Sequence, residues 1–100
     1  MARGWLIGVM VELAGEPKPV RHFFAVGLED RANAEWRAID GALKVGPVAA
    51  STVGGLEPVH ALGELSARCI DAQALRPGEV RALGPRTPRL WATIERPTQG

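Results

Sequence analysis

Two stretches near the start of the chain, Trp5–Leu13 and Val20–Leu28, carry apolar residues at alternate positions, so that one face of each is strongly apolar and the other is mixed. Because successive side chains of a strand point to opposite sides of a sheet, this alternation is typical of β-strands. Between them lies Ala14–Pro19, a turn with one glycine and two prolines, neither of which can donate to a strand ladder. The pattern therefore predicts an antiparallel hairpin.

The period of the pattern changes after the second stretch. Apolar residues now recur at helical spacing and form a stripe that consists of Ala32, Trp36, Ile39 and Leu43. Asp30 precedes this stripe, and its carboxylate suits an N-cap, where it accepts from free N–H groups of the first turn. Gly41 or Gly46 can supply a left-handed residue to end the helix, and Pro47 prevents its continuation. We therefore predict an amphipathic helix whose stripe faces the core.

The middle of the chain is expected to hold a short strand and a second helix. Val48–Val53 contains β-branched residues and ends at a pair of glycines, which favours a third strand, although its small alanines also suit a helix. Glu57 and Pro58 then open a helix, because proline fits the first turn, where its missing N–H has no partner. The apolar stripe of this helix consists of Leu62, Leu65, Cys69 and Ala72. Leu75–Gly78 ends it.

The last quarter of the chain gives a weaker pattern. Glu79–Leu83 fits either a half-turn or an edge strand, whereas Leu90–Glu95 alternates and is expected to be the last strand. Pro97–Gly100 is expected to be a loose tail. We therefore predict a single domain over residues 1–96 with the element order β-β-α-β-α-β.

Two helices with one apolar stripe each can cover one face of a four-stranded sheet. The fold class expected is thus α+β: a two-layer sandwich in which a mainly antiparallel sheet carries both helices on one face. The other face would then expose large apolar side chains, which include Leu6, Met10, Phe23 and Trp91. A twofold-related copy of the same chain is the commonest cover for such a face. These four residues are therefore the predicted interface of a homodimer.

Composition and charge narrow the choice of partners. The chain is 46% hydrophobic and 23% charged, as is usual for a globular protein, and its formal net charge is +1. The net charge therefore gives no strong electrostatic field that would favour binding to a membrane or to nucleic acid. Basic residues do gather near the C-terminus beside Trp91; they are Arg76, Arg81, Arg86 and Arg89. Sheets that bind single strands use several stacking aromatics, so nucleic-acid contact is only an alternative here.

The single cysteine and the apolar run near the N-terminus bear on the cellular compartment in which the protein is expected. The single cysteine, Cys69, excludes an internal disulfide and a cysteine-based metal cluster. The apolar run Trp5–Val11 is interrupted by Glu12 and lacks a cleavage pattern, so it does not predict a secretory signal. No apolar run approaches the ~20 residues that a membrane-spanning helix needs. We therefore expect a cytoplasmic protein.

Residues with reactive side chains are few and scattered. His22 falls on the apolar face of its strand, either as a partly buried ring or lining a pocket between sheet and helices. His60 has Glu57 and Glu64 at helical spacing, which fits a surface pair better than an acid–base pair. Cys69 lies on the opposite side of the same predicted helix, so His60 cannot activate it, and we expect the thiol to be a small core residue.

One junction has the residue types of an anion site. Ser51, Gly54 and Gly55 stand between the predicted third strand and second helix, where free N–H groups attract anions. Glu57 and Pro58 oppose this interpretation, because one adds a negative charge and the other removes a donor. The spacings of phosphate-binding loops are also absent.

The sequence therefore favours a non-enzymatic dimerisation or interaction module that binds a protein or a small ligand, without a cofactor or metal. One alternative is a small enzyme or ligand sensor with a pocket between sheet and helices, using His22, Ser51 or His60. The other is contact with nucleic acid through the arginine-rich C-terminal segment.

Overall fold

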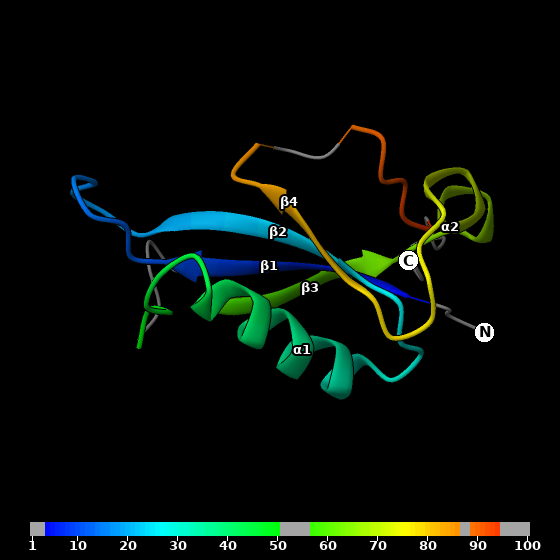
Figure 1. Cartoon of the computed structure of the whole chain (residues 1–100), viewed down its shortest axis with the longest axis horizontal. Coiled ribbons are helices and arrows are strands. Elements are labelled where there is room, and N and C mark those ends of the chain that lie inside the picture. Colours follow the sequence, from blue (N-terminus) through cyan, green and yellow to red (C-terminus); the bar gives the residue numbers. More distant parts are fainter. Residues whose placement is uncertain (1–3, 51–56, 87–88, 95–100) are drawn as a thin grey trace, which may run out of the picture.

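Four strands form one open antiparallel sheet in the computed structural model, which describes residues 4–50, 57–86 and 89–94 (Figure 1). β1 (Trp5–Val11) and β2 (Val20–Val26) form the central hairpin and pair along their whole length. β3 (Val59–Glu64) pairs with the other side of β1, and β4 (Val80–Gly84) pairs with the other side of β2. The sheet order is therefore β3-β1-β2-β4. The predicted hairpin and the predicted antiparallel sheet are confirmed.

Two helices complete the regular structure of the described residues, α1 (Arg31–Leu43) and α2 (Ala67–Gln73). The chain order is β1-β2-α1-β3-α2-β4. The predicted α+β class and the predicted order of strands and helices are confirmed. The residues that form several of these elements are nevertheless not the residues expected.

α1 begins as the sequence predicts and ends differently. A carboxylate oxygen of Asp30 accepts from the Asn33 N–H at 2.9 Å, as an N-cap does. The helix ends at Leu43 without a left-handed residue, so the role expected for Gly41 or Gly46 was wrong. Gly46 serves close approach instead, because a Cβ there would lie 2.7 Å from the carbonyl oxygen of Glu12.

α1 packs on the sheet through alanines rather than through its large side chains. Ala34, Ala38 and Ala42 are fully buried. They form the α1 cluster with sheet residues that include Ile7, Val9, Val11, Phe24 and Val26. Trp36 is 68% exposed and Leu43 is 57% exposed, so the predicted core stripe was wrong. The helix lies close to the sheet, which leaves room only for small side chains, and the strand residues supply the bulk.

The predicted second helix started too early. Residues expected to be helical from Glu57 onward form β3, and α2 starts after Ser66, whose hydroxyl accepts from the Cys69 N–H at 3.1 Å. Val59 and Ala61 of β3 pack against the α1 cluster. Their alternation is that of a strand, and pairing with β1 decides the conformation of this segment.

The predicted third and last strands were also wrong. Val48 makes a single bridge with β1, and residues 51–53 lie outside the described part of the chain. Of the predicted strand Leu90–Glu95, the structure describes residues 90–94, and only Thr93 forms a bridge, with the residue that follows β3. The fourth strand is β4, within the segment for which the pattern allows a half-turn or an edge strand.

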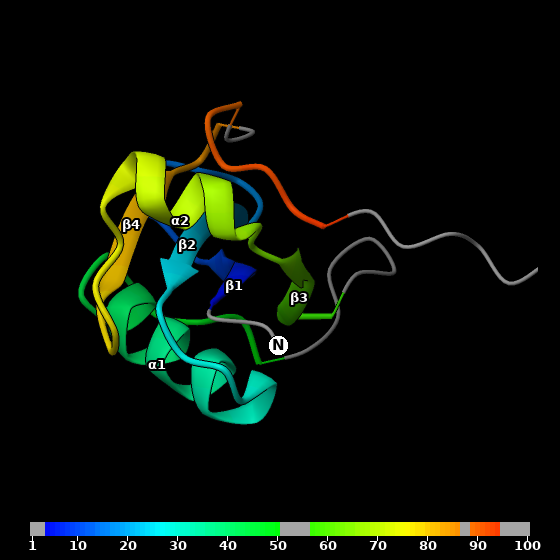
Figure 2. The ribbon, with the colours of Figure 1, turned by 90° about the vertical axis from the view of Figure 1, so that its right-hand side faces the viewer.

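The two helices lie on opposite faces of the sheet, which differs from the expected single helical layer (Figure 2). On β2, Phe24 joins the α1 cluster, whereas Phe23 and Ala25 join a second cluster. This second cluster, here called the Trp91 cluster, consists of Leu6, Phe23, Ala25, Leu65, Cys69, Ile70, Leu75 and Trp91. Because β3 and β4 are opposite edges of the sheet, their connection must cross one face, and α1 already occupies the other.

Candidate functional site

The α1 stripe, defined as Ala32, Trp36, Ile39 and Leu43, lies on the side of α1 that borders β3. Trp36 and Leu43 are exposed and Ile39 is half-buried. A hollow of about 270 Å³ separates part of this stripe from Val59 of β3, and Glu35 also lines it. The stripe is thus an apolar surface that continues onto an edge strand of the sheet.

Both edge strands carry features that discourage the addition of another strand. The pairing register shifts at a bulge between β1 and β3, and again between β2 and β4. Beyond β3, the Ile94 N–H donates to the Glu64 carbonyl at 2.8 Å, and the Ser66 N–H donates to the Ala92 carbonyl at 3.1 Å. Bulges and covered edges block edge-to-edge pairing. A helix flank, rather than a strand edge, is therefore the better candidate for a contact surface.

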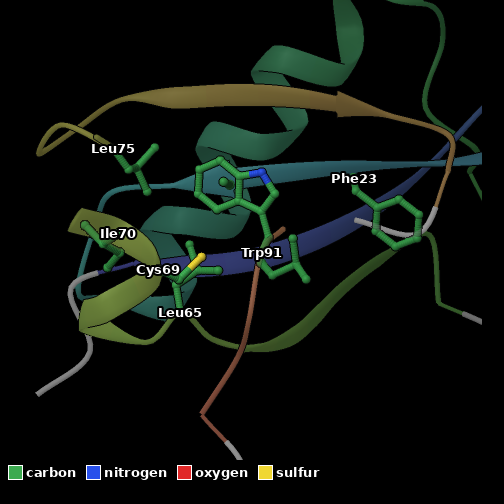
Figure 3. Close-up of a cluster of buried hydrophobic side chains, with 8 residues drawn as sticks. Phe23, Leu65, Cys69, Ile70, Leu75 and Trp91 are labelled. Carbon is green, nitrogen blue, oxygen red and sulfur yellow. The ribbon is translucent and has the colours of Figure 1, made fainter. Parts of the chain in front are cut away.

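The four residues predicted to form a dimer interface are buried within a single chain. These residues, each between 6% and 8% exposed, are Leu6, Met10, Phe23 and Trp91. Figure 3 shows the Trp91 ring among the apolar side chains of the Trp91 cluster. The chain therefore covers this sheet face itself, and another molecule would have to displace Trp91 to reach Leu6 or Phe23.

The thiol of Cys69 holds the Trp91 segment against α2. Its Sγ donates to the Leu90 carbonyl and accepts from the Ala92 N–H, each at 3.3 Å. The side chain is buried, so the predicted core role of Cys69 is confirmed. Two hydrogen bonds to one short segment explain how a stretch without regular structure stays fixed over the sheet.

Arg81 of β4 joins three parts of the molecule. Its guanidinium carbon lies 5.5 Å from the centre of the Trp91 ring, and Nη2 lies 2.8 Å from the Glu79 carboxylate. The same group donates to the carbonyl oxygens of Gln73 and Ala74 at 2.5 and 3.3 Å. Carbonyls at a helix C-terminus lack helical partners, so Arg81 satisfies the end of α2.

Two hydrogen bonds hold the pKa of Glu79 below its usual value. The larger effect comes from the Arg76 backbone N–H, which donates to Oε1 at 2.9 Å. The second comes from Arg81 Nε, which donates to Oε2 at 2.9 Å. Both donors favour the charged carboxylate. This pKa shift belongs to the turn before β4 and is explained by the contacts that hold that turn.

The residues expected to contact nucleic acid do not form one platform. Arg81 is engaged in internal contacts and Trp91 is buried, so neither offers a free stacking or phosphate-binding group. The exposed members of the set are Arg76, Arg86 and Arg89.

The two histidines point to opposite faces of the sheet. His22 lies opposite Val9 on the α1 face, and its Nε2 is enclosed without a hydrogen-bond partner among the described residues. His60 is exposed on β3, opposite Gly8, whose neighbours in β1 belong to the α1 cluster. The structure therefore does not bring them together. In the described ranges, no three of the His, Cys, Asp and Glu side chains converge as metal ligands.

Three further candidates cannot be placed. Ser51, Gly54 and Gly55 lie outside the described residues, as does the rest of the glycine junction that ends at Leu56. These ligand-binding candidates therefore stay untested.

A hollow of about 700 Å³ lies where the β2–α1 loop meets α2. Its lining consists of Gly27, Leu28, Glu29, Ile70, Asp71, Leu75, Pro77 and Gly78. Two backbone bonds hold its walls together: Gly27 N–H to the Glu79 carbonyl at 2.8 Å, and Gly78 N–H to the Gly27 carbonyl at 2.7 Å. The charged side chains that line it, Glu29 and Asp71, are both acidic.

A smaller hollow of about 300 Å³ lies on the other flank of α1, beside β4. It is lined by Phe24, Arg37, Asp40, Gly41, Lys44, Val45, Val80 and Ala82. The sequence pattern did not mark these residues as a binding site. The spacing of Arg37, Asp40 and Lys44 by three and four positions is the signal that could have identified a charged helix flank.

Comparison of the chain with protein-family models, with curated protein sequences and with solved structures found no match in any of the three. Among the described residues, neither helix has the length and the apolar character needed to cross a membrane. The surfaces described above are thus the basis for the proposals that follow.

Proposed function

We propose that this chain is a non-enzymatic interaction module that associates with a second copy through the α1 stripe. The exposed Trp36 carries the proposal. Tryptophan is the residue that most often dominates binding energy at protein interfaces, and it rarely lies so open in a monomer. Here it shares one flank of α1 with the exposed Leu43 and the half-buried Ile39.

A second copy suits this surface for three reasons. A twofold axis beside α1 would pack the stripe against itself, so one apolar surface provides both halves of the contact. The net charge of +1 opposes association only weakly. A standard interface takes roughly 800 Å² from each partner, which is a modest part of the 6616 Å² accessible surface of the chain.

This proposal keeps the homodimer expected from the sequence and changes its surface. The sheet face with Leu6 and Phe23 is covered by the chain's own Trp91 cluster, whereas the α1 stripe is open. We also place the module in the cytoplasm, where the buried, reduced thiol of Cys69 needs no oxidising partner.

Sedimentation equilibrium on the wild-type chain and on two substituted chains tests the proposal. Trp36→Glu puts a charge in the middle of the stripe and is expected to weaken self-association at least tenfold, without lowering the unfolding midpoint of the monomer. Leu90→Glu is the matched control, because Leu90 is an equally exposed apolar residue away from α1, and self-association should be unchanged. A wild-type chain that stays monomeric at high micromolar concentration contradicts the proposal, as does an equal effect of both substitutions.

The alternative of a ligand sensor or small enzyme is supported by the 700 Å³ hollow, whose volume is in the range of small-molecule sites. Its lining does not include His22 or His60, the residues on which that alternative was based. A sensor remains the second candidate, and a ligand that shifts the amide signals of Gly27 and Gly78 in NMR spectra would favour it. We favour the interaction module because the described residues of this hollow offer no nucleophile with a neighbouring base.

A further inference from the structure

We infer that the second flank of α1, beside β4, binds a small amphipathic anion: a carboxylate or phosphate head group attached to a short apolar tail. This α1–β4 site is the hollow of about 300 Å³ lined by Arg37, Asp40, Lys44 and apolar residues of both elements. It lies on the opposite flank of α1 from Trp36, so it does not depend on the proposed self-association.

The positive charge of the site is available to a ligand. Arg37 and Lys44 are exposed, and neither forms an ion pair with another described residue. They are seven positions apart, so both project from the same flank, about 10 Å apart along the helix axis. Asp40 lies between them and leaves a net charge of one positive unit. The planar guanidinium of an arginine binds a carboxylate or a phosphate through two parallel hydrogen bonds.

The apolar part of the site is provided by the sheet. Phe24 is fully buried beneath the hollow, and Val45, Val80 and Ala82 form its walls. Gly41 lets α1 lie close to this floor, because a Cβ at this position would lie 3.2 Å from both Phe24 and Val80. Glycine is unfavourable inside a helix, so its position here needs a packing reason. The result is an apolar floor with two cations on one rim.

The size of the hollow limits the ligand. A volume of about 300 Å³ is at the lower end of small-molecule sites, which fits a single short chain or ring rather than a nucleotide cofactor. The head group would meet Arg37 or Lys44 at the rim while the tail covers Phe24. An anion is favoured over a cation by the net charge, and an amphipathic anion over an inorganic one by the apolar floor.

NMR titration of the ¹⁵N-labelled chain tests the site with four probes that share one tail: octanoate, octyl phosphate, 1-octanol and octylammonium. The two anions are expected to shift the amide signals of Gly41, Val45 and Ala82, and to bind about tenfold more tightly than 1-octanol. Octylammonium should bind more weakly still. Whichever anion binds more tightly identifies the head group as carboxylate or phosphate, and either result supports the site.

Substitutions separate the charge from the shape of the site. Arg37→Gln and Lys44→Gln are each expected to weaken octanoate binding several-fold, whereas Arg31→Gln, at an exposed arginine of α1 outside the hollow, should leave it unchanged. Ala82→Phe fills the hollow from an exposed position on β4 and should abolish binding without a change of charge. Equal binding of octanoate and 1-octanol, or no shift at these three amides with millimolar octanoate, would overturn the inference.

Discussion

At Gly27 the chain leaves β2 and passes against the loop that connects α2 with β4. The Gly27 N–H and carbonyl both bond to that loop, and a Cβ at this position would overlap the carbonyl oxygen of Arg76. The obstacle is backbone held by two hydrogen bonds, so it cannot move aside as a flexible side chain could. The absence of a side chain at Gly27 thus allows the Trp91 cluster to pack over the sheet.

Gly27→Ala is therefore expected to lower the free energy of unfolding by about 3 kcal/mol, the upper end for overpacking in a close-packed region. Urea denaturation measures this change. Gly8→Ala is the matched control within the same sheet, because the atoms nearest to a Cβ there belong to the flexible side chain of Arg21, the first at 3.0 Å. It should cost less than about 1 kcal/mol. Equal losses for the two variants would contradict the geometry at Gly27.

Single residues were predictable where local chemistry decides their role. The carboxylate of Asp30 caps α1 because the first turn of any helix has free N–H groups. The exposure of Trp36 was not predictable in this way. The same helix carries an alanine row with a spacing of four, and the hydrophobic pattern gives more weight to the larger side chains. Only the distance between helix and sheet decides which row is buried.

Among the helices, α2 ends in a conformation that its sequence does not favour. Ala74 adopts a left-handed conformation with φ of 53°, which is usual for glycine and unfavourable for alanine. The Ala74 carbonyl oxygen also accepts from Arg81 at 3.3 Å, and the Leu75 N–H bonds to the Ile70 carbonyl at 3.0 Å. The surrounding contacts therefore hold the residue in this conformation.

Ala74→Gly is expected to raise the free energy of unfolding by about 1 kcal/mol, because glycine adopts the left-handed conformation without a steric cost. Ala72→Gly is the matched control, two residues earlier in the same helix and also exposed. It should lower the free energy of unfolding by about 1 kcal/mol, since glycine is unfavourable within a helix. Thermal unfolding of both variants shows whether each substitution raises or lowers the stability. A loss of stability in Ala74→Gly would contradict the left-handed conformation of Ala74.

The elements were predictable where one periodicity dominates. The two hairpin strands are seven residues long, each has one strongly apolar face at a period of two, and no helical stripe competes with it. Val59–Glu64 was assigned to a helix because Leu62, Leu65 and Cys69 recur at helical spacing, whereas its strand face consists of the small Ala61 and the lone Val59. Pairing with β1 is a contact between residues far apart in sequence. The periodicity within Val59–Glu64 therefore could not predict its pairing with β1.

In the whole molecule, the strand order determines the layers. Because β3 and β4 form opposite edges, the segment between them crosses the face that α1 leaves free, and Trp91 completes the cover. The strands carry apolar residues on both faces, as the sequence indicates, but the prediction that one face is left uncovered was wrong. The sequence did not indicate that one helix lies on each side. The candidate contact surface is therefore the α1 stripe and not the sheet face expected from the sequence.

Two tryptophans should therefore differ sharply in their effect on stability. Trp91→Ala removes the largest side chain of the Trp91 cluster and is expected to lower the free energy of unfolding by about 3–5 kcal/mol. Trp36→Ala removes an exposed side chain and should change it by less than about 1 kcal/mol when measured at a concentration low enough to keep the chain monomeric. A loss of several kcal/mol in Trp36→Ala would mean that the α1 stripe is part of the core after all.

The most direct measurement is ¹⁹F NMR of the chain labelled with 5-fluorotryptophan, recorded over a dilution series. The chain has three tryptophans, so three signals report on three surfaces: Trp5 at the end of the sheet, Trp36 on the α1 stripe and Trp91 over the second face. The account predicts that the Trp36 signal shifts or broadens as the concentration rises while the other two stay constant. A Trp36 signal that does not change with concentration, or a Trp91 signal that changes in its place, would contradict it.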